Sequence, residues 1–297
     1  FQGSCFLPNV REASGSRKGL VWLQQKLIDD VLKCKSITID SVDQGIELIR
    51  ARICSAEVLI VIDDLDSAMP LEFLEGPFVL GSTVIITTRC EDLLDTIKVD
   101  AKYKVNELSD AESRLLFCQH AFGGDTRMSN TFIKLSKEIL EHARGLPLAL
   151  KVCGSALLNK SEEGWRWFID RMRRDTIVDV ENILLISFDS LKFFDPMLQD
   201  IFLDIACFFV GREKEEVVKI MDTCYKFPNH NIDILKKRSL LTIDNGNSLG
   251  MHDLLRDMGR KIACNNSPME HGEHSRLWLS QVIYNVLKKE KVISIYI

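Results

Sequence analysis

The stretch Val58-Leu59-Ile60-Val61-Ile62-Asp63-Asp64-Leu65-Asp66 decides the fold of the chain. Five apolar residues stand in a row, and three carboxylates follow within four positions. An unbroken apolar run is typical of a parallel strand that is covered on both faces. In open α/β sheets, ligands bind just outside the carboxyl ends of such strands. The stretch therefore predicts a buried strand that brings Asp63 and Asp64 to a site for a metal-bound phosphate. In a simpler alternative, the two aspartates only end the strand and start a turn.

A second strand is predicted at Thr83–Arg89, after Gly81-Ser82. Because parallel strands end at the same edge of a sheet, Arg89 is expected beside Asp63 and Asp64, where it could stabilise charge on a terminal phosphate. The alternative role for Arg89 is a salt bridge to these aspartates. A short strand is expected at Ser4–Leu7 and a last one at Tyr103–Val105.

Helices are predicted from apolar residues at helical spacing and from capping residues. Ser41 with Gln44, and Ser109 with Glu112, have the spacing of capping boxes. Trp165, Trp167 and Phe168 are expected to anchor a core. The predicted helices are Gly19–Leu32, Ser41–Ile53, Ser109–Phe122, Phe132–Ala143, a helix opening at 146–150, Ser161–Met172, 183–188, Leu198–Phe209, Glu213–Met221, Ile232–Lys237, one opening at 251–253, and Arg276–Leu287.

A β-hairpin is predicted around Asp244-Asn245-Gly246-Asn247, because Asn-Gly between two apolar runs favours a tight turn. Helices followed by a hairpin are typical of a winged helix. The chain is therefore predicted to hold a parallel α/β region, then a small α-helical bundle, then a winged-helix domain.

Composition narrows the classes of function. The 297 residues are 46% hydrophobic and 27% charged, with a net charge of −5, which gives no general attraction to nucleic acid or to a membrane. The nine cysteines are scattered without a C-x-x-C pair, which is typical of a reduced, intracellular protein rather than of a disulfide framework or a zinc site. The expected location is cytoplasmic or nucleo-cytoplasmic. No apolar run is long enough to span a bilayer and no signal peptide opens the chain. Because the first residue is Phe1, we expect a fragment of a longer protein.

The order of motifs resembles the NB-ARC module of plant nucleotide-binding, leucine-rich-repeat immune receptors, within the P-loop signal-transduction ATPases. Asp66 and the sequence of Phe202–Phe209 resemble the corresponding residues of the class that carries an N-terminal TIR domain. The resemblance covers almost the whole chain and rests on seven segments in order: Phe6–Glu12, Val58–Asp66 (Walker B), Gly81–Arg89 (sensor strand), Glu107–Phe122, Gly145–Leu150 (Gly-Leu-Pro-Leu), Phe202–Phe209 and Met251–Asp253 (Met-His-Asp).

The resemblance implies a role for each candidate site residue. Asp63 would hold Mg²⁺ through water, and Asp64 would lie where hydrolytic members orient the attacking water. Arg89 would sense the γ-phosphate of ATP. Pro147 would pack against adenine. His252 would donate to the β-phosphate of ADP.

His252 would help to hold two domains together in the resting state. With His252 on ADP, the winged-helix domain would be held onto the nucleotide domain in the resting state, and Asp253 would support this contact from its own domain. The alternative role for His252 is that of a histidine at a helix start in an interdomain contact.

One departure from the family bears on nucleotide binding. A P-loop needs G-x-x-x-x-G-K-[ST], and no Gly-Lys pair occurs in the sequence. The chain is therefore expected to begin just after the P-loop, with an incomplete sheet that lacks the Walker A strand and helix. Binding of ADP or ATP and of Mg²⁺ is expected to be weakened or lost.

The expected domains are a partial nucleotide-binding α/β domain (1–106), a helical bundle (107–174), a winged-helix domain (175–268), and a linker helix (269–297) toward leucine-rich repeats. The leading hypothesis is an ADP/ATP-dependent molecular switch in plant defence signalling. Its partners would be an upstream TIR domain and downstream repeats, with a homo-oligomer in the active state and no nucleic acid or membrane.

Three alternatives stay open. One is a nucleotide-free protein-interaction fragment, and another is a slow ATPase that uses Asp64 as its base. The last is DNA binding through the basic residues of the winged helix, against which the acidic isoelectric point argues.

Overall fold

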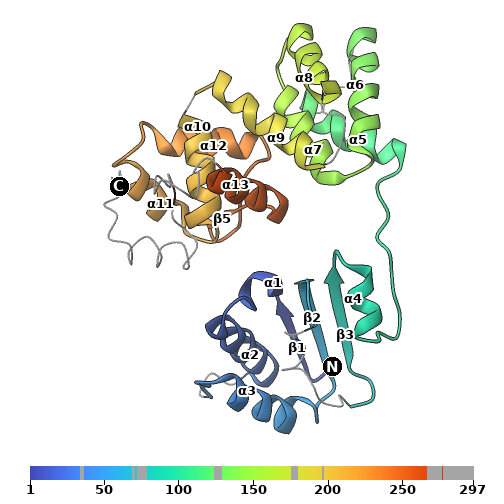
Figure 1. Cartoon of the computed structure of the whole chain (residues 1–297), viewed down its shortest axis with the longest axis vertical. Coiled ribbons are helices and arrows are strands. Elements are labelled where there is room, and N and C mark those ends of the chain that lie inside the picture. The colour runs from blue at the N-terminus through green and yellow to red at the C-terminus, as the bar shows by residue number, and fades with distance from the viewer. Residues whose placement is uncertain are drawn as a thin grey trace. The chain divides into compact units, whose positions relative to one another are not determined.

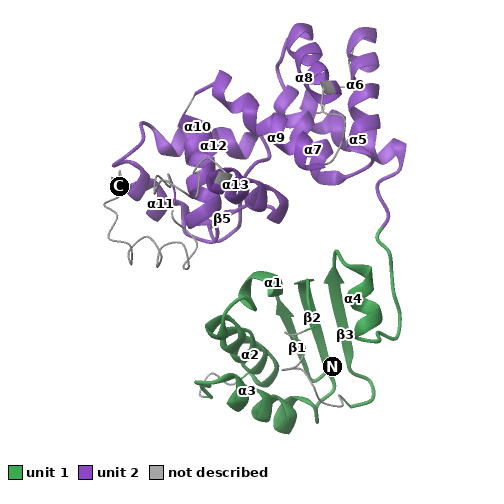
Figure 2. Ribbon diagram, viewed as in Figure 1, with its two compact units in different colours: residues 1–105 green, residues 106–297 purple. Residues whose placement is uncertain are grey.

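The computed structural model divides into two compact units, Phe1–Val105 and Asn106–Ile297 (Figures 1 and 2). Each unit is described by itself. The structure describes residues 1–33, 37–68, 71, 79–123, 129–174, 180–195, 197–265 and 276. Within these ranges, none of the helices combines the length and the apolar character needed to cross a membrane.

The first unit is built on a parallel sheet of β1 (Gly3–Leu7), β2 (Val58–Leu65) and β3 (Thr83–Thr88), in the order β1-β2-β3. The register pairs Leu7 with Ile62 and Ile62 with Ile86. These are three of the strands that the sequence predicts, so the parallel α/β fold is confirmed. The carboxyl ends of all three strands lie at one edge of the sheet (Figure 1).

One face of this sheet carries the core of the unit. Ile60 and Ile62 of β2 are at most 1% exposed and pack in one cluster with apolar residues of α2 (Arg17–Leu32) and of the π-helical turn η1 (Ile49–Ile53). The opposite face is different, because Phe6 of β1 is 50% exposed and Ile85 of β3 is 48% exposed. The unbroken apolar run predicted burial on both faces, and the described part of the unit buries one.

One helix of the first unit begins at the cap that the sequence predicts. The hydroxyl of Ser41 accepts from the backbone N–H of Gln44, at 3.3 Å, and opens α3 (Val42–Leu48). The second arm of the box differs, because the Gln44 side chain accepts from the N–H of Asp40, one residue earlier than predicted. Other helices of the unit are α1 (Val10–Ala13) and α4 (Glu91–Thr96).

The strand predicted at Tyr103–Val105 is wrong. These residues lie in an extended segment outside any strand, with Tyr103 at 87% and Val105 at 80% exposed. Their alternation of apolar and polar residues imitates a half-buried strand, but no described strand pairs with them.

The second unit begins with a bundle of α5 (Asp110–Phe122), α6 (Asn130–Ala143), α7 (Pro147–Leu157) and α8 (Glu162–Arg174). The capping box of Ser109 and Glu112 is present in both arms. Trp165 is 1% exposed, and its ring lies 5.1 Å from that of Phe132 and 5.9 Å from that of Phe117, measured between centroids. Phe168 is also buried, whereas Trp167 is 38% exposed and packs edge-on against Phe193, so its prediction as a core residue is wrong.

The remainder of the second unit is helical apart from a small hairpin. A second core gathers around α10 (Met197–Asp204) and α13 (Asp253–Asn265). The predicted helix Leu198–Phe209 is divided into an α-helix and a π-helical turn, the kind of bulge that is frequent at functional sites. The elements are α9 (Val180–Asp189), η3 (Ser190–Phe193), α10 (Met197–Asp204), η4 (Ile205–Phe209), α11 (Lys214–Met221), α12 (Pro228–Lys237), β4 (Thr242–Ile243), β5 (Leu249–Gly250) and α13 (Asp253–Asn265).

The predicted hairpin is confirmed, because β4 and β5 pair antiparallel with Ile243 opposite Leu249. Helix α9 joins the two cores of this unit. Its Ile183 and Ile186 belong to the core of the bundle, and its Leu184 and Phe188 belong to the core of the winged helix. The bundle and the winged helix therefore form one compact unit.

The finer domain boundaries stay a proposal, since the contacts divide the chain into two units. The helix predicted at Arg276–Leu287 lies outside the described residues, apart from Arg276 itself.

Candidate functional site

The candidate site begins at the carboxyl end of β2, where both aspartates lie. The register between β2 and β3 shifts between Ile62 and Leu65, so Asp63 and Asp64 occupy a β-bulge inside the strand rather than its tip. Asp64 has a φ of 57°, in the left-handed region, which a short polar side chain tolerates better than most. Bulges redirect side chains and are over-represented next to active sites. In this sheet the bulge places two neighbouring carboxylates at the edge.

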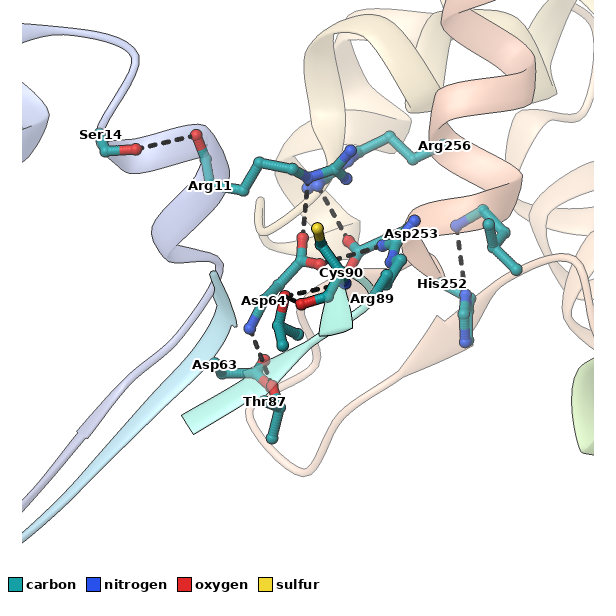
Figure 3. A network of polar contacts seen from close by, with 12 residues as sticks. Arg11, Ser14, Asp63, Asp64, Thr87, Arg89, Cys90, His252, Asp253 and Arg256 are labelled. Atoms are coloured by element: carbon teal, nitrogen blue, oxygen red, sulfur yellow. Dashed lines mark hydrogen bonds and ion pairs between the residues drawn. The ribbon is translucent and has the colours of Figure 1, made fainter. Parts of the chain in front are cut away.

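Thr87 of β3 holds the bulge in place. Its hydroxyl donates to Oδ1 of Asp63 at 2.7 Å and accepts from the backbone N–H of Asp64 at 2.9 Å (Figure 3). One side chain therefore fixes the carboxylate of one aspartate and the backbone of the next. The residue pattern predicted this strand but did not point to Thr87.

Two arginines neutralise Asp64. Nε of Arg11 lies 2.9 Å from Oδ2, and Nη2 of Arg89 lies 3.3 Å from Oδ1 (Figure 3). The Asp64 side chain is 12% exposed, whereas those of Arg11 and Arg89 are 29% and 48% exposed. Arg89 thus lies beside the acidic pair as predicted, in the salt bridge that was the alternative to a phosphate contact.

Arg11 is a second site residue that the residue pattern did not predict. It lies in α1, directly after the carboxyl end of β1. The topological argument that placed Arg89 at this edge applies equally to a residue after β1, so the signal was present in the sequence.

The other two candidates belong to the second unit. Pro147 is the first residue of α7 and follows Gly145, whose φ is 70°. His252 directly precedes α13, and its Nδ1 accepts from the backbone N–H of Leu254 at 3.2 Å (Figure 3). With Nδ1 as an acceptor, the neutral ring carries its proton on Nε2, which is therefore a donor. The three candidates Asp63, Asp64 and Arg89 lie together at the sheet edge of the first unit. The other two candidates are described only within the second unit.

Asp253 is tied within its own helix. Its Oδ1 accepts from Nη2 of Arg256 at 2.9 Å, and the Arg256 side chain is 6% exposed. This contact fixes the start of α13, directly after His252. The predicted role of Asp253 as a support from its own domain is compatible with this pair.

The oxygen atoms and the guanidinium group at the sheet edge are of the kinds that bind a divalent cation together with a phosphate. Among the described residues, no group of three or more His, Cys, Asp or Glu side chains could hold a metal ion. Mg²⁺ is commonly bound through one or two carboxylates, with waters and phosphate oxygens completing the shell. Asp63 with the Thr87 hydroxyl offers such oxygens, and Arg89 offers a guanidinium for phosphate.

The fold and this edge together define a class. The parallel sheet has carboxylates on its Walker B-like strand and an arginine directly after the next strand, and a helical bundle and a winged helix follow it. This is the α/β fold of P-loop type coupled to a winged-helix module. Residues 197–267 match the model of the winged-helix domain of Roq1-like disease resistance proteins.

Sequence comparison extends the match to nearly the whole chain. The chain is 39% identical to TMV resistance protein N of Nicotiana glutinosa over 97% of its length. It is 37% identical to disease resistance protein RUN1 and 36% identical to RPV1, both of Vitis rotundifolia, over 94% of its length. The chain thus belongs to the plant disease resistance proteins of the TIR class and corresponds to their NB-ARC module.

The chain spans only a fifth to a quarter of the length of these relatives, at 24%, 21% and 20%. A Walker-type ATPase of Pyrococcus abyssi is similar at a TM-score of 0.29 and 14% identity, over 87% of this chain and 84% of that one.

Proposed function

We propose that the chain is the core of an ADP/ATP-dependent molecular switch in a plant immune receptor. The observation that carries the proposal is the meeting of Asp63, Asp64 and Arg89 at one edge of a parallel sheet, in a chain related to disease resistance proteins. Carboxylates and an arginine at this edge are the groups that recognise the phosphates of a nucleotide and its metal ion.

Each residue has a role in this proposal. Asp63 and the Thr87 hydroxyl would provide oxygens to Mg²⁺, and Arg89 would exchange Asp64 for a terminal phosphate oxygen. Pro147 would pack against the adenine. Nε2 of His252, the donor nitrogen, would contact the β-phosphate of ADP. The phosphates of the bound nucleotide would supply the negative charge to which Arg89 and His252 donate.

A switch needs a ligand that binds its two states with different affinity. A histidine donor that meets ADP in the resting state, and an arginine that meets the additional phosphate of ATP, would give the two nucleotides such a difference. The upstream TIR domain, the downstream repeats, homo-oligomerisation on activation and a cytoplasmic location belong to this proposal for the whole protein.

The observed ion pairs disfavour the slow ATPase. A general base must accept a proton from water, and both carboxylate oxygens of Asp64 face guanidinium groups at 2.9 and 3.3 Å. The nucleotide-free interaction fragment remains the second candidate, because the sequence has no Gly-Lys pair for the phosphates.

The test is the nucleotide content of the purified chain. The protein is denatured and the released small molecules are separated by ion-exchange chromatography. Near-stoichiometric ADP supports the switch core, and loss of that ADP in His252→Ala would assign it to this site. Absence of ADP in the chain, with no binding of a fluorescent ADP or ATP analogue at millimolar concentration, would refute the proposal and favour the interaction fragment.

A further inference from the structure

We propose that Arg11 is a positioning residue of the phosphate site, which keeps Asp64 neutralised while Arg89 moves to the ligand. The inference rests on the proposed function and adds a residue and a mechanism to it. Arg11 would touch neither nucleotide nor metal. It would act through Asp64, by deciding how strongly this carboxylate holds Arg89.

The two ion pairs of Asp64 are unequal. Nε of Arg11 donates to Oδ2 at 2.9 Å, within normal hydrogen-bond length, whereas Nη2 of Arg89 lies 3.3 Å from Oδ1. The side chain of Arg89 is also the more exposed of the two, at 48% against 29%. Exposed, longer ion pairs contribute little free energy to stability. Arg89 is therefore the arginine that can leave Asp64 to bind a phosphate.

The backbone of Arg11 is fixed on both sides. Leu7 at the end of β1 and Val10 at the start of α1 are both fully buried. The carbonyl of Arg11 accepts from the hydroxyl of Ser14 at 3.2 Å (Figure 3). Arg11 is therefore anchored at the sheet edge, and its guanidinium stays with Asp64 when Arg89 leaves.

The consequence for Arg89 follows from charge. Asp64 is only 12% exposed, and a mostly buried carboxylate without a cation is costly. With Arg11 present, departure of Arg89 leaves Asp64 with a hydrogen-bonded guanidinium. Without Arg11, departure of Arg89 would leave Asp64 uncompensated, so the carboxylate would hold Arg89 back from the phosphate. Arg11 thus makes the partner exchange of Arg89 possible.

This mechanism predicts a rescue that a purely structural role would not give. Arg11→Gln should weaken binding of a fluorescent non-hydrolysable ATP analogue about tenfold, which is about 1.4 kcal/mol. In Arg11→Gln with Asp64→Asn, the carboxylate that restrains Arg89 is absent, and affinity should return to within about threefold of the unmodified chain. The matched control is Arg17→Gln, which removes the same charge at the start of α2 and should bind like the unmodified chain. Failure of the double variant to recover would overturn the proposal.

A second measurement needs no nucleotide. Native-state hydrogen exchange of the β2 amides reports how Arg89→Gln affects the edge with and without Arg11. We expect Arg89→Gln to lower protection less than about threefold in the unmodified chain and about tenfold in the Arg11→Gln background, because Asp64 then loses its remaining cation. Equal effects in the two backgrounds would overturn the role of Arg11. Absence of all nucleotide binding would refute the proposed function and with it the positioning role of Arg11, whereas binding without recovery in the double variant would overturn the role of Arg11 alone.

Discussion

Replacing Thr87 by valine removes one hydroxyl from the sheet edge and leaves the β-branched shape of the side chain. Two hydrogen bonds are lost: the one donated to Asp63 at 2.7 Å and the one accepted from the N–H of Asp64 at 2.9 Å. Without them, the bulge keeps Asp64 at a φ of 57° with less support. We expect the first unit to become less stable and the two aspartates to lose their fixed orientation.

The magnitude follows from the two bonds. A hydrogen bond to a charged acceptor contributes about 1.5–3 kcal/mol and a neutral one about 0.5–1.5 kcal/mol. Thr87 is exposed and Asp63 is half-buried, so water replaces part of this loss. The expected decrease in the free energy of unfolding of the first unit is about 1–2 kcal/mol, a factor of about 5–30 in the folded-to-unfolded ratio.

Hydrogen exchange of the buried amides around Ile60 and Ile62 measures this change in the first unit alone, which unfolding of the whole chain would not. Thr83→Val is the matched control, because it makes the same replacement at an exposed threonine of the same strand and should change stability by less than about 0.5 kcal/mol. Thr87→Ser keeps the hydroxyl and should retain most of the stability. If Thr87→Val and Thr83→Val have the same effect, the hydroxyl bridge contributes nothing and the reasoning is refuted.

Three further predictions concern the second unit and the cysteines. Ser109→Ala removes the capping box of α5 and should cost about 1 kcal/mol, seen as faster hydrogen exchange in the first turn of this helix; unchanged exchange would contradict the role of the cap. Burial, followed by the charge of Lys151, lowers the pKa of His120 below its ordinary value of 6.5, so the unfolded chain binds the proton first and stability should fall as pH decreases through about 6.5. Urea unfolding followed between pH 8 and pH 5 should show a smaller decrease in His120→Gln, and an equal decrease would contradict the assignment. Burial raises the pKa of Cys153 to about 12, so iodoacetamide should modify the exposed Cys90 in the native chain and reach Cys153 only after unfolding. Peptide mapping by mass spectrometry measures the two rates of modification, and equal rates would contradict the burial of Cys153.

Local signals in the sequence predicted the elements well where their partners are near in sequence. Ser109 and Glu112 lie three residues apart and form the expected box, because such a cap depends on one turn of helix. The Asn-Gly turn gave the hairpin for the same reason. The pattern failed at Tyr103–Val105, because alternation describes a strand only when another strand is available to pair with it.

The candidate site was predicted in part. Asp63, Asp64 and Arg89 do meet, because the ends of parallel strands share an edge. Arg11 and Thr87 were missed. The position of Arg11 after β1 points to this edge, but its contact with Asp64, like the contacts of Thr87, depends on the direction of side chains at a bulge that no residue pattern predicts.

By itself the sequence determined the order of elements, the family and the strand edge at which the acidic pair stands. Only the tertiary structure decided that Arg11, 53 residues before Asp64, is its hydrogen-bonded partner, and that Thr87 bridges the two aspartates. The physical reason is strand register. Pairing of Leu7 with Ile62 and of Ile62 with Ile86 sets the distances between residues far apart in the chain, and a shift by one residue would turn each side chain to the other face of the sheet.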